Sequence, residues 1–217
     1  MTFTNRIVTI PPIKLNNTNL VELNEGKFLG VLIDNKLKFD SHIDFISKKI
    51  SKSLGIIYRL RECLPQSKLK SLYYTFIYPY LLYCNLAWGG TCATYIDRLL
   101  KLQKRVIRIM TGSSYRAHTN ELFIEHEILK INEIHDLKLG LYMFNLESRD
   151  EWLRRHCYNT RYSNLLNPAF ARLVSTQRSL AVAAVNFWNR LPDSLKTIRT
   201  HSKFKRQLKS SLLNRYN

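Results

Sequence analysis

Cysteine and glycine are scarce in this sequence, and neither is arranged as a metal or phosphate site would require. The four cysteines are scattered along 217 residues, without a Cys-x-x-Cys pair or a histidine spaced to complete a tetrahedral metal site. The seven glycines form no phosphate-binding loop. These absences argue against a zinc knuckle, a disulfide framework and a nucleotide-binding loop. They make a reducing compartment the default and imply no resident cofactor.

Acidic residues are also few, and this shortage bears most directly on function. The chain holds 34 Lys and Arg against 16 Asp and Glu, which gives a formal net charge of +18 and a pI near 9.9. Such an excess predicts attraction to polyanions, among which nucleic acid is the commonest, because Lys and Arg contacts to phosphates release condensed counterions. Charge alone leaves open a basic protein of another kind, or one that binds ribosomes or membrane surfaces.

Signals for secretion or membrane insertion are weak. Arg6, Pro11 and Pro12 interrupt any apolar leader, so we expect a nuclear or cytoplasmic protein that is not secreted. The uncharged stretch between residues 71 and 96 is long enough to span a bilayer, but Pro79 interrupts it and its tyrosines are spread along it. We therefore expect a buried helix pair there and no membrane partner.

Apolar spacing predicts a mainly α-helical fold. Ser41 and Asp44 resemble a capping box that opens a helix ending near Cys63. The apolar stripe of that helix comprises Ile43, Ile46, Ile50, Leu54, Ile57 and Leu60. A second helix begins at Pro65 and ends or kinks near Pro79, and a third spans residues 94–110 with Gly112 as its stop. Before these helices, residues 13–21 and 27–33 predict two short strands joined by a turn around residues 24–26.

The third helix has two distinct faces. Its apolar face carries Ile96, Leu99, Leu100, Val106, Ile107 and Met110, and its opposite face carries Arg98, Lys101, Lys104, Arg105 and Arg108. No acidic residue follows Asp97 in this helix, which favours phosphate contact over a surface neutralised by ion pairs. A solvated surface that is merely basic is the alternative.

The second half of the chain predicts further helices around an irregular connection. Residues 121–128 and 133–147 have helical periodicity, residues 156–179 do not, and helices are expected again at 179–191 and about 202–213. The last of these has Phe204, Leu208 and Leu212 on one side and basic residues around it.

Two blocks of motifs give the chain a family resemblance. The first runs from Lys27 to Gly112 and contains KFLGVLIDNKLKFDSHI, LYYTFIYPYLLYCNLAWG and RLLKLQKRVIRIMTG; the second is FWNRLPDSLKTIRTHSKFKRQLKSSLL. In this order they resemble the region downstream of the active site, and then the C-terminal segment, of reverse transcriptases from non-LTR (LINE-like, jockey-type) retrotransposons. TFTNRIVTIPPIKLNNTNLVEL is similar to the family's connection between palm strands. Met1 would then be an internal methionine, and the chain a C-terminal fragment.

The resemblance implies four regions and no independent catalysis. They are a palm-remnant β-hairpin (1–40), a thumb-like helical domain (41–112), a helical extension (113–155) and a C-terminal Trp-Asn-x-Leu-Pro segment with a basic helix (156–217). Full-length relatives would be RNA-directed DNA polymerases that use Mg²⁺ held by paired aspartates. This chain has no adjacent Asp-Asp, and nothing in the sequence positions Asp34, Asp40 and Asp44 together. We therefore expect no catalytic residue, no metal site and no enzyme activity from this chain alone.

Binding residues follow from the same resemblance. Phe28 and Gly30 match a Phe-Leu-Gly motif at the family's primer grip, where Leu29 is expected to pack within a strand. The thumb cradles the template–primer duplex through its backbone, which makes the candidates for phosphate contact Lys48, Lys49, Lys52, Arg98, Lys101, Arg105 and Arg108. Trp88 is expected in the core. The role of the Trp188–Pro192 motif, WNRLP, stays open, and Ala183 and Ala184 predict helix just before it, where the family often has a glycine.

These inferences predict RNA or RNA–DNA duplex as the partner, together with the palm domain of the same polymerase, and no small-molecule substrate. Two other interpretations remain. The chain could be a basic helical interaction or structural protein that meets an acidic protein or an anionic membrane, or it could be a remnant of a mobile element without function.

Overall fold

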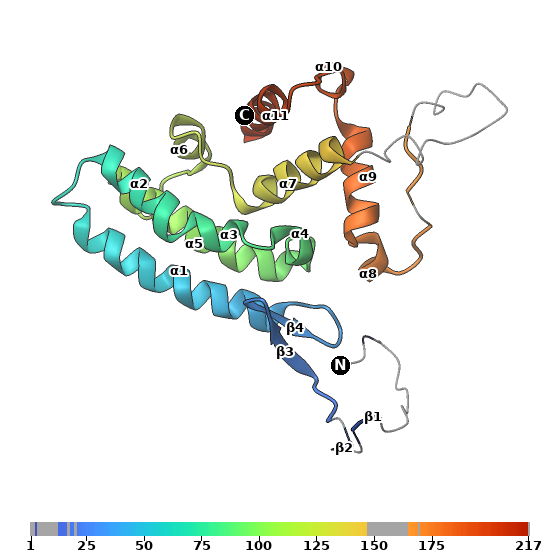
Figure 1. Ribbon diagram of the computed structural model, residues 1–217. Coiled ribbons are helices and arrows are strands. Elements are labelled where there is room, and N and C mark those ends of the chain that lie inside the picture. The colour runs from blue at the N-terminus through green and yellow to red at the C-terminus, as the bar shows by residue number, and fades with distance from the viewer. Residues whose placement is uncertain are drawn as a thin grey trace.

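The computed structural model describes residues 3, 13–16, 18–19, 21–146, 165–168 and 170–216. The described chain is mainly helical and carries small antiparallel two-stranded sheets near its N-terminus, as the sequence predicted. In Figure 1 the sheets project from one end of helix α1, away from the helical body.

The N-terminal strands pair differently from the sequence-based expectation. β1 (Lys14–Leu15) pairs with β2 (Thr18–Asn19), and β3 (Glu25–Phe28) pairs with β4 (Val31–Asp34). The tight turn of the second hairpin consists of Leu29 and Gly30, whose φ angles of 45° and 86° suit a two-residue hairpin loop. The prediction of one strand over residues 27–33 is therefore wrong, because the turn lies inside it, and residues 25 and 26 belong to a strand rather than to a turn.

The entry into α1 (Asp40–Leu60) depends on a carboxylate from the hairpin. Asp34 accepts hydrogen bonds from the backbone N–H groups of Lys36, Lys38 and Phe39, at 2.9, 3.1 and 2.7 Å. Phe39, in the left-handed region at φ 58°, precedes the helix without a side-chain cap. The predicted capping box is wrong: the Ser41 hydroxyl instead donates to Glu25 at 2.6 Å, and so ties α1 to β3.

Three long helices, α1, α2 (Gln66–Phe76) and α5 (Ala93–Thr111), form the first half of the body. The stripe predicted for the first helix is confirmed for Ile43, Ile46, Ile50, Leu54 and Ile57, which are all buried, whereas Leu60 at its end is only partly buried. Gly112 ends α5 at φ 66°, also as predicted.

The uncharged stretch is broken into short helices. Beyond the end of α2 it forms α3 (Tyr78–Leu82) and α4 (Asn85–Trp88), which are separated at Tyr83 and Cys84. Trp88 has no exposed surface, which confirms its place in the core. In the part of the chain that the structure describes, no helix is long and apolar enough to cross a membrane.

A buried glutamine joins the two halves of the body. Gln103 on α5 donates from Nε2 to the Tyr73 hydroxyl at 2.8 Å and to the Leu129 carbonyl at 2.7 Å, and its Oε1 accepts from the Ile131 N–H at 2.9 Å. One side chain thus connects α5 to α2 and to the start of α7. Burial of the Tyr73 phenol raises its pKa, which keeps it neutral in this network.

The second half packs around α7 (Ile131–Asn145). Its helices are α6 (Asn120–Glu125), α7, α8 (Val174–Gln177), α9 (Leu180–Arg190), α10 (Asp193–Lys196) and α11 (His201–Leu213), followed by a 3-10 turn at Asn214–Tyr216. A Cβ atom at Gly140 would lie 2.5 Å from Leu208 and 3.1 Å from Phe187, so this glycine lets α9 and α11 approach α7 closely. Buried side chains from Val31 to Tyr216 form one hydrophobic cluster. Of the connection predicted over residues 156–179, residues 156–164 and 169 lie outside the described part.

Candidate nucleic-acid interface

Helices α1 and α5 lie side by side and run in the same direction (Figure 1). Near their N-terminal ends, Arg98 on α5 contacts Asp44 on α1 with an N–O distance of 2.7 Å. At the opposite end, Tyr58 on α1 and Arg61, directly after that helix, line a common hollow with Arg105 on α5. The basic side chains of α1 and α5 therefore project from one pair of parallel helices.

The lysines of α1 are exposed. Lys48 and Lys52 are one turn apart on the same face, opposite the buried isoleucines. Lys49 lies further round the helix, with its ammonium 5.5 Å from the centre of the Phe45 ring. Lys27 from β3 approaches the same ring at 5.8 Å, so the hairpin adds a cation beside those of α1.

On α5, the cations differ in how far they are neutralised. Lys101 and Arg105 are exposed, and neither has a carboxylate partner among the described residues. Arg108 is half-buried and donates from Nε to the Ala117 carbonyl at 3.0 Å. Arg98 is exposed but pairs with Asp44, so the expectation of a basic face without ion pairs is wrong at this position. The carboxylate belongs to Asp44 on α1, so the sequence of α5 alone gives no sign of this ion pair. An exposed ion pair of this kind contributes little stability.

The tip of the β3–β4 hairpin is open to solvent. Phe28 is 65% exposed and Leu29 is 74% exposed, so Leu29 does not pack within a strand as expected. The Leu29 carbonyl accepts a hydrogen bond from the Tyr83 hydroxyl at 2.5 Å. Gly30 faces the same ring, with its Cβ position 3.7 Å from a Tyr83 carbon atom. The hairpin tip is thus held against Tyr83, between α3 and α4, and Phe28 remains exposed.

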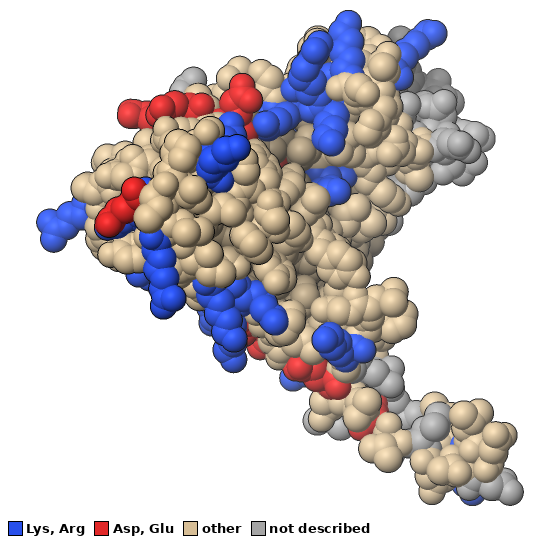
Figure 2. Space-filling model, turned by 60° about the vertical axis from the view of Figure 1, so that its left-hand side comes forward, with Lys and Arg blue, Asp and Glu red and all other residues tan. Residues whose placement is uncertain are grey.

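A second basic surface lies on α11, the helix that the sequence identified as basic but to which no binding residue was assigned. Lys203, Lys205 and Arg206 on α11 are exposed. Desolvation by burial, together with the nearby cations of Lys70 and Lys205, lowers the pKa of Lys209, although Glu127 opposes this shift. Figure 2 shows Lys and Arg in separate groups on the visible face, one along the lower edge at the level of α1 and one at the top at the level of α11. The run SKFKRQLK was the sequence signal for this second surface.

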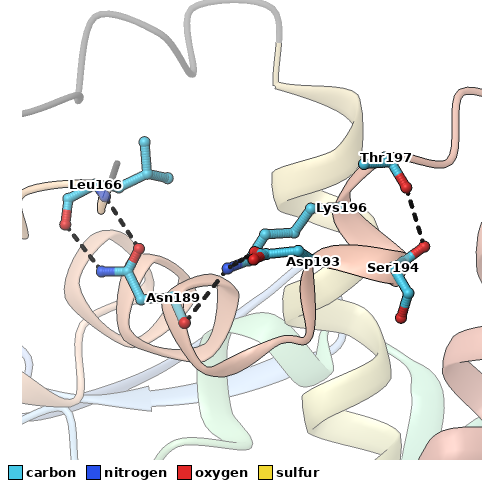
Figure 3. Close-up of polar contacts among 6 residues, drawn as sticks. All are labelled: Leu166, Asn189, Asp193, Ser194, Lys196 and Thr197. Carbon is cyan, nitrogen blue, oxygen red and sulfur yellow. Dashed lines mark hydrogen bonds and ion pairs between the residues drawn. The ribbon is translucent and has the colours of Figure 1, made fainter. Parts of the chain in front are cut away.

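The WNRLP motif anchors a distant segment of the chain. Trp188 is buried near the end of α9, with its ring 5.8 Å from that of Phe204. Asn189 accepts from the Leu166 N–H at 3.0 Å and donates to the Leu166 carbonyl at 2.9 Å (Figure 3). Ala183 and Ala184 lie inside α9, which confirms the helix predicted before the motif.

Comparison with curated proteins identifies distant relatives of the chain. It is 28% identical over 137 residues, or 62% of its length, to a protein described as a probable RNA-directed DNA polymerase from transposon X-element of Drosophila melanogaster. RNA-directed DNA polymerases from mobile element jockey are 26% identical in Drosophila funebris and 23% identical in D. melanogaster, over 61% of this chain. The chain is a distant homologue of jockey-type reverse transcriptases.

The homology has clear limits. The chain spans 15% of the length of these curated relatives. No family model matches it. No solved structure matches it either. Among the described residues, no three His, Cys, Asp or Glu side chains are grouped so that they could hold a metal ion.

Proposed function

We propose that this chain is the thumb and C-terminal region of a jockey-type reverse transcriptase and binds the backbone of RNA or of an RNA–DNA duplex. The homology to RNA-directed DNA polymerases and the order of the two motif blocks support this assignment. The observation that carries the binding proposal is the parallel α1–α5 pair, which bears Lys48, Lys52, Lys101 and Arg105 in exposed positions. Lys49, Arg98 and Arg108 extend the proposed contact, with Phe28 and Gly30 at the hairpin.

Physical chemistry favours a phosphate backbone as the ligand of this surface. Each phosphate neutralised by Lys or Arg releases condensed counterions, and such contacts set orientation without reading sequence. The described residues form four ion pairs, so most of the Lys and Arg side chains in that part of the chain have no carboxylate within 4.0 Å. The surface is therefore available to a polyanion.

The nearby carboxylates have structural roles, so we propose that this region binds without polymerising. Template-directed nucleotide addition needs closely placed carboxylates that hold two divalent metals. Asp34 is occupied by three backbone N–H groups, Asp40 accepts from the N–H of Ser41 at 2.9 Å, and Asp44 pairs with Arg98. Catalysis and its Mg²⁺ would belong to the palm of a longer polymerase.

The exposed N-terminal hairpins support a second partner. Ile13, Leu15, Val21 and Leu23 are 56–83% exposed, an unusual placement for large apolar side chains in strands or beside them. Two-stranded hairpins cannot bury such residues by themselves. We propose that these residues pack on the palm sheet of the polymerase.

Fluorescence anisotropy with a labelled RNA–DNA duplex tests the binding proposal. Seven phosphate contacts would give a slope of log K against log salt of about −6, since each contributes about −0.9. The variant K48E/K52E/K101E/R105E should bind far more weakly, and its slope should be smaller in magnitude by about 4.

The matched control changes the same number of charges on the other surface. R199E/K203E/K205E/R206E alters four exposed cations of α11 and the segment before it. It should bind more tightly than the α1–α5 variant at every salt concentration. Equal losses in the two variants would show that net charge, rather than the α1–α5 surface, drives binding. Preferential flotation with anionic liposomes in the presence of competing RNA would favour a membrane partner and contradict the proposal.

A further inference from the structure

A hollow of about 360 Å³ lies where the C-terminal ends of α1 and α5 meet. This volume falls in the range of about 300–1,000 Å³ that is typical of small-ligand sites. Its polar and aromatic lining comes from the end of α1 and the residue after it, from α5 and from the segment that follows Gly112, and comprises Tyr58, Arg61, Arg105, Arg108, Ser113 and Tyr115. The hollow continues the basic face of α5, because Arg105 and Arg108 belong to both.

Three guanidinium groups converge on this hollow. Arg108 is fixed by its bond to the Ala117 carbonyl at 3.0 Å, and Arg105 has no ion-pair partner among the described residues. Arg61 pairs with Glu62 at 3.3 Å, but both side chains are exposed, so a phosphate could replace that carboxylate at little cost. Planar guanidinium groups match the geometry of phosphate oxygens better than ammonium groups do.

Two exposed tyrosines also line the hollow. Tyr58 is 50% exposed and Tyr115 is 81% exposed, so neither side chain is covered by packing. The Arg61 guanidinium lies 4.2 Å from the centre of the Tyr58 ring, which makes the pair a flat platform. Rings and guanidinium planes of this kind are the surfaces on which unpaired bases stack.

We propose that this hollow binds an unpaired nucleotide, with its phosphate on Arg61, Arg105 and Arg108 and its base against Tyr58 and Tyr115. The inference rests on the proposed function and refines it. A continuous duplex offers phosphates but keeps its base faces stacked inside, so it would leave the two tyrosines unused. The end of the α1–α5 pair therefore accepts single strand that extends beyond the duplex.

The test compares a blunt RNA–DNA duplex with the same duplex carrying a short single-stranded extension whose first unpaired base is 2-aminopurine. The wild-type protein should bind the extended duplex about tenfold more tightly than the blunt one, because stacking of a base on an aromatic ring is strong. Binding should also quench the 2-aminopurine emission. Y58A/Y115A should lose both the preference and the quenching while its affinity for the blunt duplex stays within about twofold.

The single variant Y115A is used beside the double variant in case the double variant misfolds. Tyr115 is mostly exposed, and circular dichroism can verify the fold of Y115A. The matched control is F170A, which removes a ring that is 93% exposed beside α9, and it should keep the preference. Equal binding of the two duplexes by the wild type, or an unchanged preference in Y58A/Y115A, would overturn this inference while duplex binding stands. If neither duplex binds, the proposed function itself fails.

Discussion

At the scale of single residues, buried polar groups hold this fold in one arrangement. Gln103 satisfies three partners from three parts of the chain and is itself 1% exposed. A buried amide of this kind contributes little net energy when it is paired, but its loss leaves every partner unpaired.

Gln103→Leu should therefore lower the free energy of unfolding by about 3 kcal/mol, because the Tyr73 hydroxyl, the Leu129 carbonyl and the Ile131 N–H would remain buried without partners. Urea unfolding followed by circular dichroism measures the change. Gln207→Leu, at an exposed position of α11, is the control and should stay within about 0.5 kcal/mol of the wild type. Equal stability of the two variants would show that the network does not stabilise the fold.

At this scale, the sequence predicted the role of a residue correctly where the local pattern of apolar residues indicates that its side chain is buried. The isoleucines of α1 and Trp88 lie in the core as predicted. It failed where a distant partner decides a role: Ser41 bonds to Glu25, and Asp44 to Arg98, 54 residues along the chain. Nor did the sequence single out Tyr58, Arg61 and Tyr115, because only the parallel packing of α1 and α5 brings them to one hollow.

At the scale of elements, helix positions were largely predictable and the strands were not. Residues 94–110 and 202–213 were predicted as helices within one or two residues of α5 and α11, because long amphipathic patterns are strong signals. The strand expected over residues 27–33 is instead split by the β3–β4 turn, because Leu29 adopts a positive φ, which an apolar residue seldom does.

The bridge between α9 and Leu166 makes a prediction at the element scale. Asn189→Leu removes both hydrogen bonds to Leu166, so residues 165–168 should lose their attachment to α9 while the helix itself persists. The cost should be about 1–3 kcal/mol. Hydrogen exchange followed by mass spectrometry should show faster exchange at residues 165–168 and an unchanged rate at residues 182–188.

Asn186→Leu supplies the control for this prediction, since Asn186 is exposed on the same helix. It should leave exchange at residues 165–168 as in the wild type. Unchanged protection of the Leu166 amide in Asn189→Leu would mean that the WNRLP motif does not hold residues 165–168 through Asn189.

At the scale of the whole molecule, the net charge and the buried histidines together determine how stability changes at low pH. The chain carries +18 with its six histidines neutral, so each added proton increases self-repulsion. Burial lowers the pKa of His42 and of His135 from the usual 6.5. The Nδ1 atom of His42 faces the Leu32 N–H at 3.4 Å and accepts its hydrogen bond only while the ring is neutral.

The free energy of unfolding should therefore be highest above about pH 7 and fall as the pH decreases through 6.5. Below that pH the histidines of the unfolded chain take up protons, whereas His42 and His135 of the folded chain stay neutral until the pH reaches their lower pKa values. Urea unfolding at pH 7.5, 6.5 and 5.5 measures this decrease. His135→Asn should reduce it, and His118→Asn, at an exposed position, should not. A flat profile between pH 7.5 and 5.5 would contradict the assignment.

The common direction of α1 and α5 has an electrostatic consequence. Each helix carries roughly half an elementary negative charge at its C-terminal carbonyl groups, and here the two ends adjoin. Arg59 and Arg108 occupy the last turns, and Arg61 and Arg105 lie close by. Peptide dipoles, together with the Glu62 carboxylate that pairs with Arg61, offset the mutual repulsion of these guanidinium groups. Being fixed in the main chain, these dipoles would not have to be displaced if an anion bound to the arginines, as we propose.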